Sequence, residues 1–211
     1  MSRSTVLLQA QTQVGITENP AGSNLQKYGA AYGFNGVPWC VIFLWWVFQT
    51  AGEGKAFFDG GKVASCGVLM RWAQCAGRWK TENPQPGDIV ILNFSGTSDT
   101  EHCGLITKVI DAQSFQTIEG NTTPGLEGSQ DNGGNVAIKI RRRQNAIGYF
   151  SPKYSDENAE YEGHWAQVSI DRLRALGIMQ GYPDGTFQPD KEMTRAEFSE
   201  SICRLLDYLG K

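Results

Sequence analysis

The sequence is poor in several features that mark whole classes of protein. It has two histidines among 211 residues, and its net charge of −3 lacks the basic excess that nucleic-acid-binding surfaces normally need. The apolar run at 41–48 is far shorter than the roughly 20 residues that a membrane-spanning helix requires. We therefore expect neither a nucleic acid nor a membrane as a partner.

The five cysteines also lack the pattern of a structural framework. Their number is odd and no two are spaced as Cys-x-x-Cys, so we expect neither a set of disulfides nor a zinc cage. No metal and no cofactor is predicted. Near the start, Gln9, Gln11 and Gln13 interrupt any apolar stretch, which argues against a secretory signal peptide and for synthesis in the cytoplasm.

What is present divides into two regions. Apolar spacing predicts helices over 4–14, around 24–32 and over 40–51, and alternating runs predict strands at 88–94, 103–110, 114–119 and 135–140. Helices followed by an antiparallel sheet indicate an α+β domain, over 1–152. A polar, acidic connector at 150–163 leads to a small all-α region, 153–211, with helices predicted at about 164–176, closed by Gly177, and from Arg195 onward. We find no internal repeat.

Cys40 is the first candidate catalytic residue. It follows Pro38-Trp39 and opens a helix that is apolar on nearly every side. A thiol at a helix N-terminus feels the positive end of the helix dipole, which lowers its pKa and favours the nucleophilic thiolate. The alternative is that Cys40 is a small buried hydrophobic residue with no chemistry.

His102 begins an alternating strand and is the one histidine of the first region. Since side chains alternate along a strand, Cys103 is expected to point away from His102, and Gly104 to leave space for substrate. Glu119 and Asn121 are predicted to share a face of a later strand. Cys40 as nucleophile, His102 as base and Glu119 as the group that orients the imidazole then supply the roles of a cysteine-peptidase site, with Asn121 as a spare polar donor.

These residues stand in motifs that resemble the CHAP family of cysteine- and histidine-dependent amidohydrolases and peptidases. The resemblance covers 15–152 and rests on Gly22-Ser23-Asn24, Pro38-Trp39-Cys40, Pro86-Gly87-Asp88, His102-Cys103-Gly104 and Glu119-Gly120-Asn121. It implies a papain-like α+β fold that hydrolyses amide bonds of peptidoglycan. Some family members carry an acidic calcium loop before the cysteine, but 24–37 contains no Asp or Glu, so we predict no calcium there.

The second region carries a predicted capping box, Thr194 with Glu197, flanked by a hydrophobic pair, Met193 and Phe198. Apolar residues on its two helices are expected to form buried stripes: Trp165, Val168 and Leu176 on the first, and Phe198, Ile202, Leu205 and Leu209 on the second. Arg195 has no such structural explanation. A cation is disfavoured in the first turn of a helix, unless it joins the free amides there to bind an anion.

Residues 154–209 resemble an S-layer homology (SLH) module. The matching stretches are His164-Trp165-Ala166, Gly181-Tyr182-Pro183-Asp184-Gly185-Thr186-Phe187 and Thr194-Arg195-Ala196-Glu197-Phe198. The resemblance implies binding of anionic secondary polymers of the cell wall through Arg195, Trp165, Asp184 and Gly185, although Trp165 also has a structural interpretation as a helix start packed on the core. SLH modules usually occur in threes, and this chain has one.

The combined prediction is a peptidoglycan hydrolase of the endolysin type, released to the wall by a holin or by lysis. It is either an endopeptidase or an N-acetylmuramoyl-L-alanine amidase. Its expected partners are peptidoglycan, an anionic wall polymer and further copies of itself, with a trimer favoured. Two alternatives stay open: an inactive wall-binding or scaffold protein, and an acyl-transferring cysteine enzyme, because a thioester passes to an amine as well as to water. The run Arg141-Arg142-Arg143 is interpreted as the solvated face of a strand.

Overall fold

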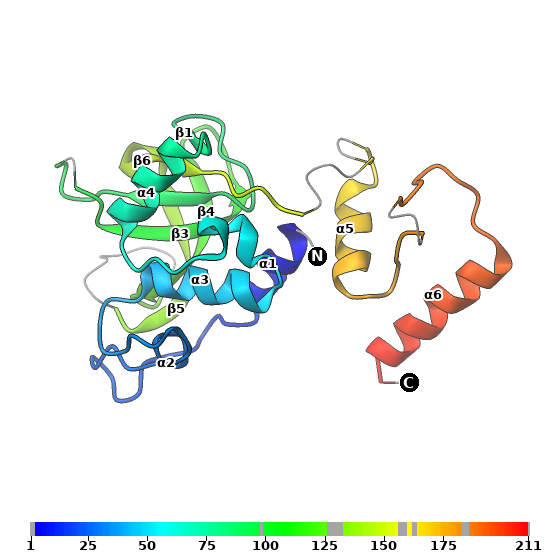
Figure 1. Cartoon of the computed structure of the whole chain (residues 1–211), viewed down its shortest axis with the longest axis horizontal. Coiled ribbons are helices and arrows are strands. Elements are labelled where there is room, and N and C mark those ends of the chain that lie inside the picture. The colour runs from blue at the N-terminus through cyan, green and yellow to red at the C-terminus, as the bar shows by residue number, and fades with distance from the viewer. Residues whose placement is uncertain are drawn as a thin grey trace. The chain divides into compact units, whose positions relative to one another are not determined.

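The computed structural model describes residues 3–97, 99–125, 133–155, 160–161, 164–182 and 186–210. By its internal contacts the chain divides into two compact units. One spans Val6–Lys153, and the other contains Tyr154–Lys211 together with the first five residues. Figure 1 shows both units, and each is described by itself below.

The first unit is built on an antiparallel sheet, as the α+β prediction requires. Among the described residues the sheet has six strands in the order β1-β6-β2-β3-β4-β5, and every neighbouring pair is antiparallel. The four predicted strands are present as β2 (Ile89–Leu92), β3 (His102–Val109), β4 (Ser114–Thr122) and β5 (Asn135–Arg142). The strands β1 (Trp79–Lys80) and β6 (Ala146–Phe150) were not predicted.

The α-helices that come before the sheet in the sequence are α1 (Arg3–Gln11), α2 (Lys27–Tyr32), α3 (Cys40–Thr50) and α4 (Cys66–Cys75). The first three lie where apolar spacing placed them, and α4 was not predicted. Short 3-10 turns are η1 (Gly54–Ala56), η2 (Phe58–Gly60) and η3 (Arg143–Asn145). In the described parts of the chain, no helix is both long and apolar enough to cross a membrane.

Helix α3 is buried against strands β3 and β4. Gly120 on β4 permits this approach, because a Cβ there would lie only 2.6 Å from the Cβ of Phe43. A separate cluster of buried residues lies within the sheet and consists of Val90, Leu92, Ile106, Phe115 and Tyr149. The packed sheet therefore fixes the start of α3, where Cys40 stands, beside the start of β3, where His102 stands.

The second unit contains α5 (Gln167–Ala175) and α6 (Arg195–Tyr208), and its described residues include no strand. Gly177 adopts a φ of +70° just after α5, as expected of a helix-ending glycine. The capping box is confirmed: the Thr194 side chain accepts from the Glu197 amide, and the Glu197 carboxylate accepts from the Thr194 amide.

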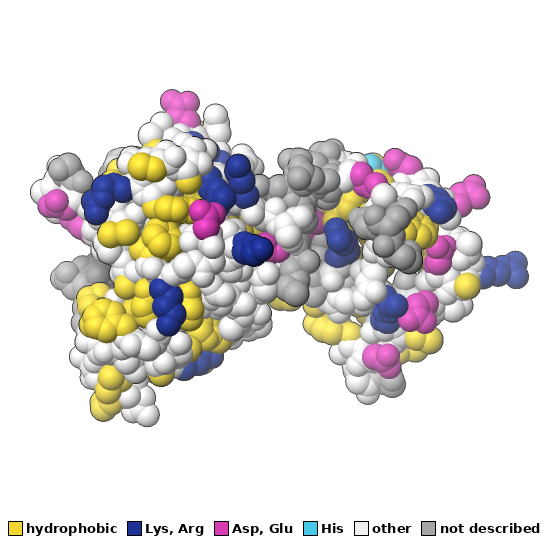
Figure 2. All heavy atoms as spheres, viewed as in Figure 1, with side chains coloured by type: hydrophobic (Ala, Val, Ile, Leu, Met, Phe, Trp, Pro, Cys, Tyr) yellow, Lys and Arg dark blue, Asp and Glu magenta, His cyan; other side chains and the backbone are white. Residues whose placement is uncertain are grey.

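The apolar stripes of this unit were expected to be buried, and that expectation is wrong. Trp165 is 90% exposed and Phe198 is 58% exposed, and α6 buries none of its residues. The space-filling view shows hydrophobic side chains at the surface of this unit (Figure 2). The physical reason is size: a unit this small buries a low fraction of its surface and cannot cover two apolar helix faces.

Candidate active site

Cys40 is held at the N-terminus of α3 by the residue before it. Trp39 is fully buried, its carbonyl accepts from the Phe43 amide, and its indole donates to Glu18 Oε1 at 2.8 Å. The ring of Tyr28 stacks on Trp39 with the centroids 5.5 Å apart. These contacts fix the direction in which the helix begins, so the Cys40 thiol sits at the positive end of the helix dipole, as predicted.

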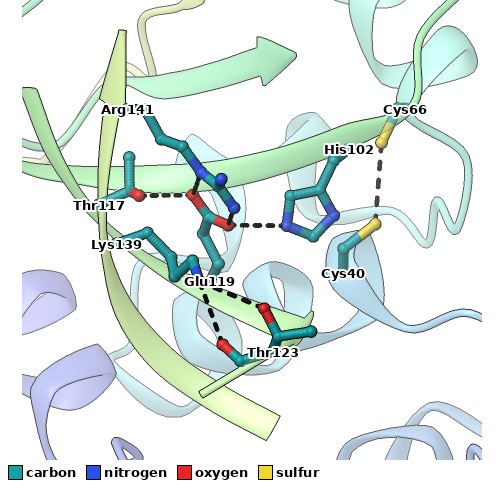
Figure 3. Close-up of polar contacts among 8 residues, drawn as sticks. All are labelled: Cys40, Cys66, His102, Thr117, Glu119, Thr123, Lys139 and Arg141. Atoms are coloured by element: carbon teal, nitrogen blue, oxygen red, sulfur yellow. Dashed lines mark hydrogen bonds and ion pairs between the residues drawn. The ribbon is translucent and has the colours of Figure 1, made fainter. Parts of the chain in front are cut away.

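His102 lies between Cys40 and Glu119 (Figure 3). Its Nε2 is 3.0 Å from Glu119 Oε2, and its other ring nitrogen points toward the Cys40 thiol. Both His102 and Glu119 are almost completely buried. The structure thus brings together three of the residues that the sequence suggested, in the order thiol, imidazole, carboxylate.

Glu119 is itself held by two further residues. Arg141 donates from Nε to Glu119 Oε1 at 2.8 Å and from Nη2 to Oε2 at 2.6 Å, and the Thr117 hydroxyl donates to Oε1 at 2.5 Å. A bidentate arginine–carboxylate pair is among the strongest hydrogen-bonded contacts in proteins. The carboxylate is therefore fixed in place before it meets the imidazole.

The charges of the site follow from these contacts. Burial raises the pKa of Glu119, but hydrogen bonds from Arg141 and His102 outweigh it and lower the pKa to about 2. Burial lowers the pKa of His102, yet hydrogen bonds with Cys40 and Glu119 raise it to about 9. Hydrogen bonds from Cys103 and Cys66, together with His102, hold the pKa of Cys40 well below its usual range. The favoured state near neutral pH is a thiolate beside an imidazolium.

Cys103 was expected to point away from His102, and that orientation stays a prediction, but its sulfur lies close to the Cys40 thiol. The sulfurs of Cys40, Cys66 and Cys103 lie within 4.8 Å of one another, and all three side chains are buried. Cys103 does alternate with Gly104 along β3, but helix α3 brings Cys40 to the region where Cys103 lies. Cys66 begins α4, and its sulfur is 3.8 Å from that of Cys40.

This thiol cluster is also the one group of described residues with the spacing of a metal site. Metals bind thiolates rather than thiols. Burial raises the pKa of Cys103 well above the usual value. A hydrogen bond from Cys103 lowers the pKa of Cys66, but the hydrogen bond with Cys40, burial and the charge of Cys40 outweigh it and raise that pKa well above the usual value. Two of the three ligands thus resist ionisation, and the prediction that the chain needs no metal stays a prediction.

Gly104 has a different role from the one expected. A Cβ at this position would lie 2.7 Å from Glu119 Cγ and 3.2 Å from Thr117 Cβ. The space beside His102 is therefore filled by the Glu119 side chain and is not open to substrate. Glycine is needed here so that the carboxylate can reach across from β4.

Asn121 is placed differently from Glu119. The β4–β5 pairing shifts between Glu119 and Thr122, and Asn121 adopts a φ of +57°. This irregularity breaks the simple alternation on which the shared face was predicted. Asn121 is buried, and its Oδ1 has no hydrogen-bond partner among the described residues. Its role as a polar donor stays a prediction.

Sequence reasoning missed Arg141 and Lys139. Both are buried on β5, with the Lys139 ammonium 3.2 Å from the carbonyl oxygen of Thr123, so their face of the strand is not the solvated one that was expected. The usable signal was the spacing. Two cations at i and i+2 share a face, and in the antiparallel register Lys139 pairs with Thr117, two residues before Glu119.

The second unit presents its own candidate residues. Arg195 and Trp165 are exposed, and Asp184 and Gly185 lie outside the described residues. A pocket of about 520 Å³ lies between residues 179–182, residues 187–193 and α6. Lys191 and Arg204 contribute positive charge to its lining, and Glu197 and Glu200 contribute negative charge. The Lys191 ammonium lies 4.2 Å from the centre of the Tyr182 ring, which also lines the pocket.

Comparison with family models identifies two domains. Residues 32–121 match the CHAP domain and residues 161–199 match the S-layer homology domain. The chain therefore carries a CHAP domain followed by a single SLH domain, which confirms the architecture that the motifs predicted.

Similar proteins match over short stretches. Outer membrane protein SlpA of Deinococcus radiodurans is 51% identical over 47 residues, which are 22% of this chain and 4% of that protein. A cellulosome-anchoring protein of Acetivibrio thermocellus is 46% identical over 50 residues, 24% of this chain and 11% of the relative. The chain thus spans a small part of these relatives. The crystal structure of Ly7917 is 17% identical with a TM-score of 0.42, over 72% of this chain and 63% of that one.

Proposed function

We propose that this chain, with its CHAP domain and single SLH domain, is a peptidoglycan hydrolase that cleaves amide bonds of the wall peptide through Cys40 and His102. The observation that carries the proposal is the buried series Cys40, His102, Glu119 and Arg141. Along this series Arg141 holds Glu119, Glu119 favours protonated His102, and His102 favours the Cys40 thiolate. The buried Arg141–Glu119 pair that contacts the His102 imidazole favours an enzyme over an inactive scaffold, because a scaffold does not require a fixed imidazole.

In the proposed reaction the Cys40 thiolate attacks the carbonyl carbon of the scissile amide. The oxygen gains negative charge, which the free amide groups at the start of α3 stabilise. The imidazolium of His102 then gives its proton to the departing amine, and a thioester with Cys40 remains. Neutral His102 next takes a proton from water, and the resulting hydroxide attacks the thioester and releases Cys40.

Glu119 and Arg141 act as positioning residues in this scheme. Glu119 accepts from His102 Nε2, so the other ring nitrogen is left to exchange its proton with Cys40 and with the amine. Arg141 keeps Glu119 ionised and in place. The carboxylate also stabilises the imidazolium that exists before the first step and disappears during it.

The second unit supplies wall binding in this proposal. We assign the catalytic domain to 1–152 and the wall-binding module to 153–211. Arg195 and Trp165 are exposed and available to an anionic secondary polymer, and Asp184 and Gly185 join them on the family motif. Relatives named as an outer membrane protein and as a cellulosome-anchoring protein support a place at the cell surface. The endolysin role stays a prediction.

Product analysis tests the proposal. Purified peptidoglycan is incubated with the full chain, and soluble fragments are identified by mass spectrometry. We expect cleavage at one type of amide bond, which also separates endopeptidase from amidase. Cys40→Ala should release no fragments and keep its circular dichroism spectrum, whereas the control Cys75→Ala, at an exposed cysteine, should cleave normally. Fragments joined to an added amine would indicate acyl transfer, and no fragments from the wild type would indicate a scaffold.

A further inference from the structure

In the first unit the N-termini of two helices lie close together. Cys40 begins α3 and Cys66 begins α4, and their sulfurs lie 3.8 Å apart (Figure 3). Both residues are buried, with 8% of Cys40 and 7% of Cys66 exposed. The proposed hydrolysis uses Cys40 and gives Cys66 no part.

The two sulfurs of the pair are in direct contact. The sulfurs of a disulfide lie about 2.05 Å apart, so a change of side-chain angle that closes under 2 Å joins them. The two thiols also differ in a useful way. His102 lies beside Cys40 and favours its thiolate, whereas Cys66 is kept as a thiol. The Cys40 thiolate is therefore able to attack an oxidant, and the Cys66 thiol beside it can react with the oxidised Cys40.

We propose that Cys40 and Cys66 form a peroxide-reactive pair, in which hydrogen peroxide oxidises Cys40 and Cys66 then closes a reversible Cys40–Cys66 disulfide. The disulfide occupies the nucleophile, so hydrolysis stops while it lasts. It also protects Cys40, because a sulfenic acid left without a neighbouring thiol proceeds to sulfinic and sulfonic acids that thiols do not reduce.

The chemistry balances in two steps. The Cys40 thiolate attacks one oxygen of the peroxide, the O–O bond breaks, and the hydroxide that leaves takes a proton from His102 to become water. Cys40 is then a sulfenic acid. The Cys66 sulfur attacks the Cys40 sulfur, the S–S bond forms and the S–O bond breaks, and the second hydroxide leaves as water with the Cys66 proton. The two sulfurs together lose two electrons, which reduce one peroxide to two waters.

Cys66 is a better resolving thiol than Cys103. Cys103 lies inside strand β3, is completely buried, and is fixed by pairing with Ile91 of β2. Cys66 is the first residue of α4 and follows the irregular segment 61–65. No strand pairing fixes its backbone, so a small shift is easier there than at Cys103. The 3.8 Å contact is one of two sulfur–sulfur hydrogen bonds of Cys40, and the other is with Cys103.

Mass spectrometry of the intact full chain tests the inference without any assay of hydrolysis. Before the free thiols are blocked, peroxide treatment should lower the intact mass by about 2 Da relative to the untreated chain. Blocking should then label two fewer thiols than in the untreated chain. Trypsin cleaves after Lys55, Lys62 and Arg71, which places Cys40 and Cys66 in separate peptides. The linked pair should therefore appear as one species that dithiothreitol separates.

The variants make the outcome decisive. In Cys66→Ser, peroxide should add about 32 or 48 Da to Cys40. After treatment with dithiothreitol, the amount of reactive Cys40 thiol should be about tenfold lower than in the wild type. Cys75→Ser, on the same helix but exposed, should behave as the wild type. A wild-type Cys40 that gains oxygen without losing 2 Da would overturn the inference, as would a disulfide to Cys103. These contradicting outcomes are measured on the wild type, so the test remains decisive even if a variant folds poorly.

Discussion

Glu119 bears a full negative charge at a position with no access to water. A buried carboxylate is costly, and only excellent geometry compensates for the lost hydration. Arg141 provides that geometry through two hydrogen bonds, and His102 and Thr117 add one each. The proposed chemistry thus depends on Arg141, which acts through Glu119.

Arg141→Gln should therefore destabilise the first unit severely. Removal of one partner of a buried ion pair leaves the other charge uncompensated, at a cost of about 3–5 kcal/mol in the free energy of unfolding. Arg142→Gln is the matched control, since its side chain is exposed and such changes usually stay within about 0.5 kcal/mol. Urea denaturation of both variants measures the difference. Equal stabilities would show that the pair does not hold the site.

The pH dependence of Cys40 follows from its hydrogen bonds with Cys103 and Cys66 and from its pairing with His102. Between the lowered pKa of Cys40 and the pKa of His102 near 9, the pair exists as thiolate and imidazolium. Below that window Cys40 takes up a proton, and above it His102 loses the proton that the departing amine needs. Glu119, with a pKa of about 2, stays charged throughout.

We expect hydrolysis to reach a plateau near neutral pH and to fall above about pH 9. Alkylation of Cys40 by iodoacetamide should be fast already at neutral pH, whereas in the denatured chain it should rise through about 8.5, the value for an ordinary thiol. His102→Ala should reduce the early reactivity, although the hydrogen bonds from Cys103 and Cys66 remain. An alkylation profile for native Cys40 that matches the denatured chain would contradict the ion pair.

At this scale the sequence predicts the groups that do chemistry better than the groups that support them. Cys40, His102 and Glu119 stand in recognisable motifs, and their roles follow from residue type. Arg141 belongs to a run of three arginines that the sequence pattern assigned to the solvated face of a strand. Which of the three is buried depends on strand register, and a β-bulge in β4 alters that register next to Asn121.

At the scale of single elements, the N-terminus of α6 combines a confirmed capping box with an unexplained arginine. Thr194 and Glu197 satisfy their own amides, whereas Arg195 is exposed in the first turn. A cation there opposes the helix dipole unless an anion joins it. The element is therefore stable in spite of Arg195, which is the basis for assigning the residue to binding.

Arg195→Ala should weaken binding to walls that carry anionic polymer without loss of helix. A hydrogen bond to a charged group contributes about 1.5–3 kcal/mol, so the affinity should fall about tenfold or more. Arg172→Ala, an exposed arginine on α5, is the control for general loss of positive charge. Sedimentation with purified walls measures both. If the two variants bind alike, Arg195 is incidental.

Elements with strong local signals were predictable, and those that depend on distant contacts were not. Helix α3 is apolar throughout, and α6 begins with its capping box. Strand β6 gave little signal because it is short and contains Gly148, where a Cβ would lie 2.4 Å from the Trp79 ring. That glycine is required by packing against β1, which the sequence alone does not show.

At the scale of the whole molecule, the second unit exposes what a stable domain normally buries. Trp165, Val168, Phe198, Tyr208 and Leu209 are all exposed. The sequence located the apolar stripes correctly, but it could not show that one module alone leaves them uncovered. Small domains without disulfides or metals usually require further packing, often through oligomerisation.

Self-association through this unit is the expected consequence, with a trimer as the favoured state. Light scattering at micromolar concentration should give a mass well above that of the 23.2 kDa chain. Phe198→Glu should shift the mass toward the monomer, because it places a charge on the exposed face of α6. Phe34→Glu, at an equally exposed phenylalanine of the first unit, should leave the mass unchanged. A monomeric wild type whose second unit is stably folded would refute the prediction, since the exposed stripes would then need no partner.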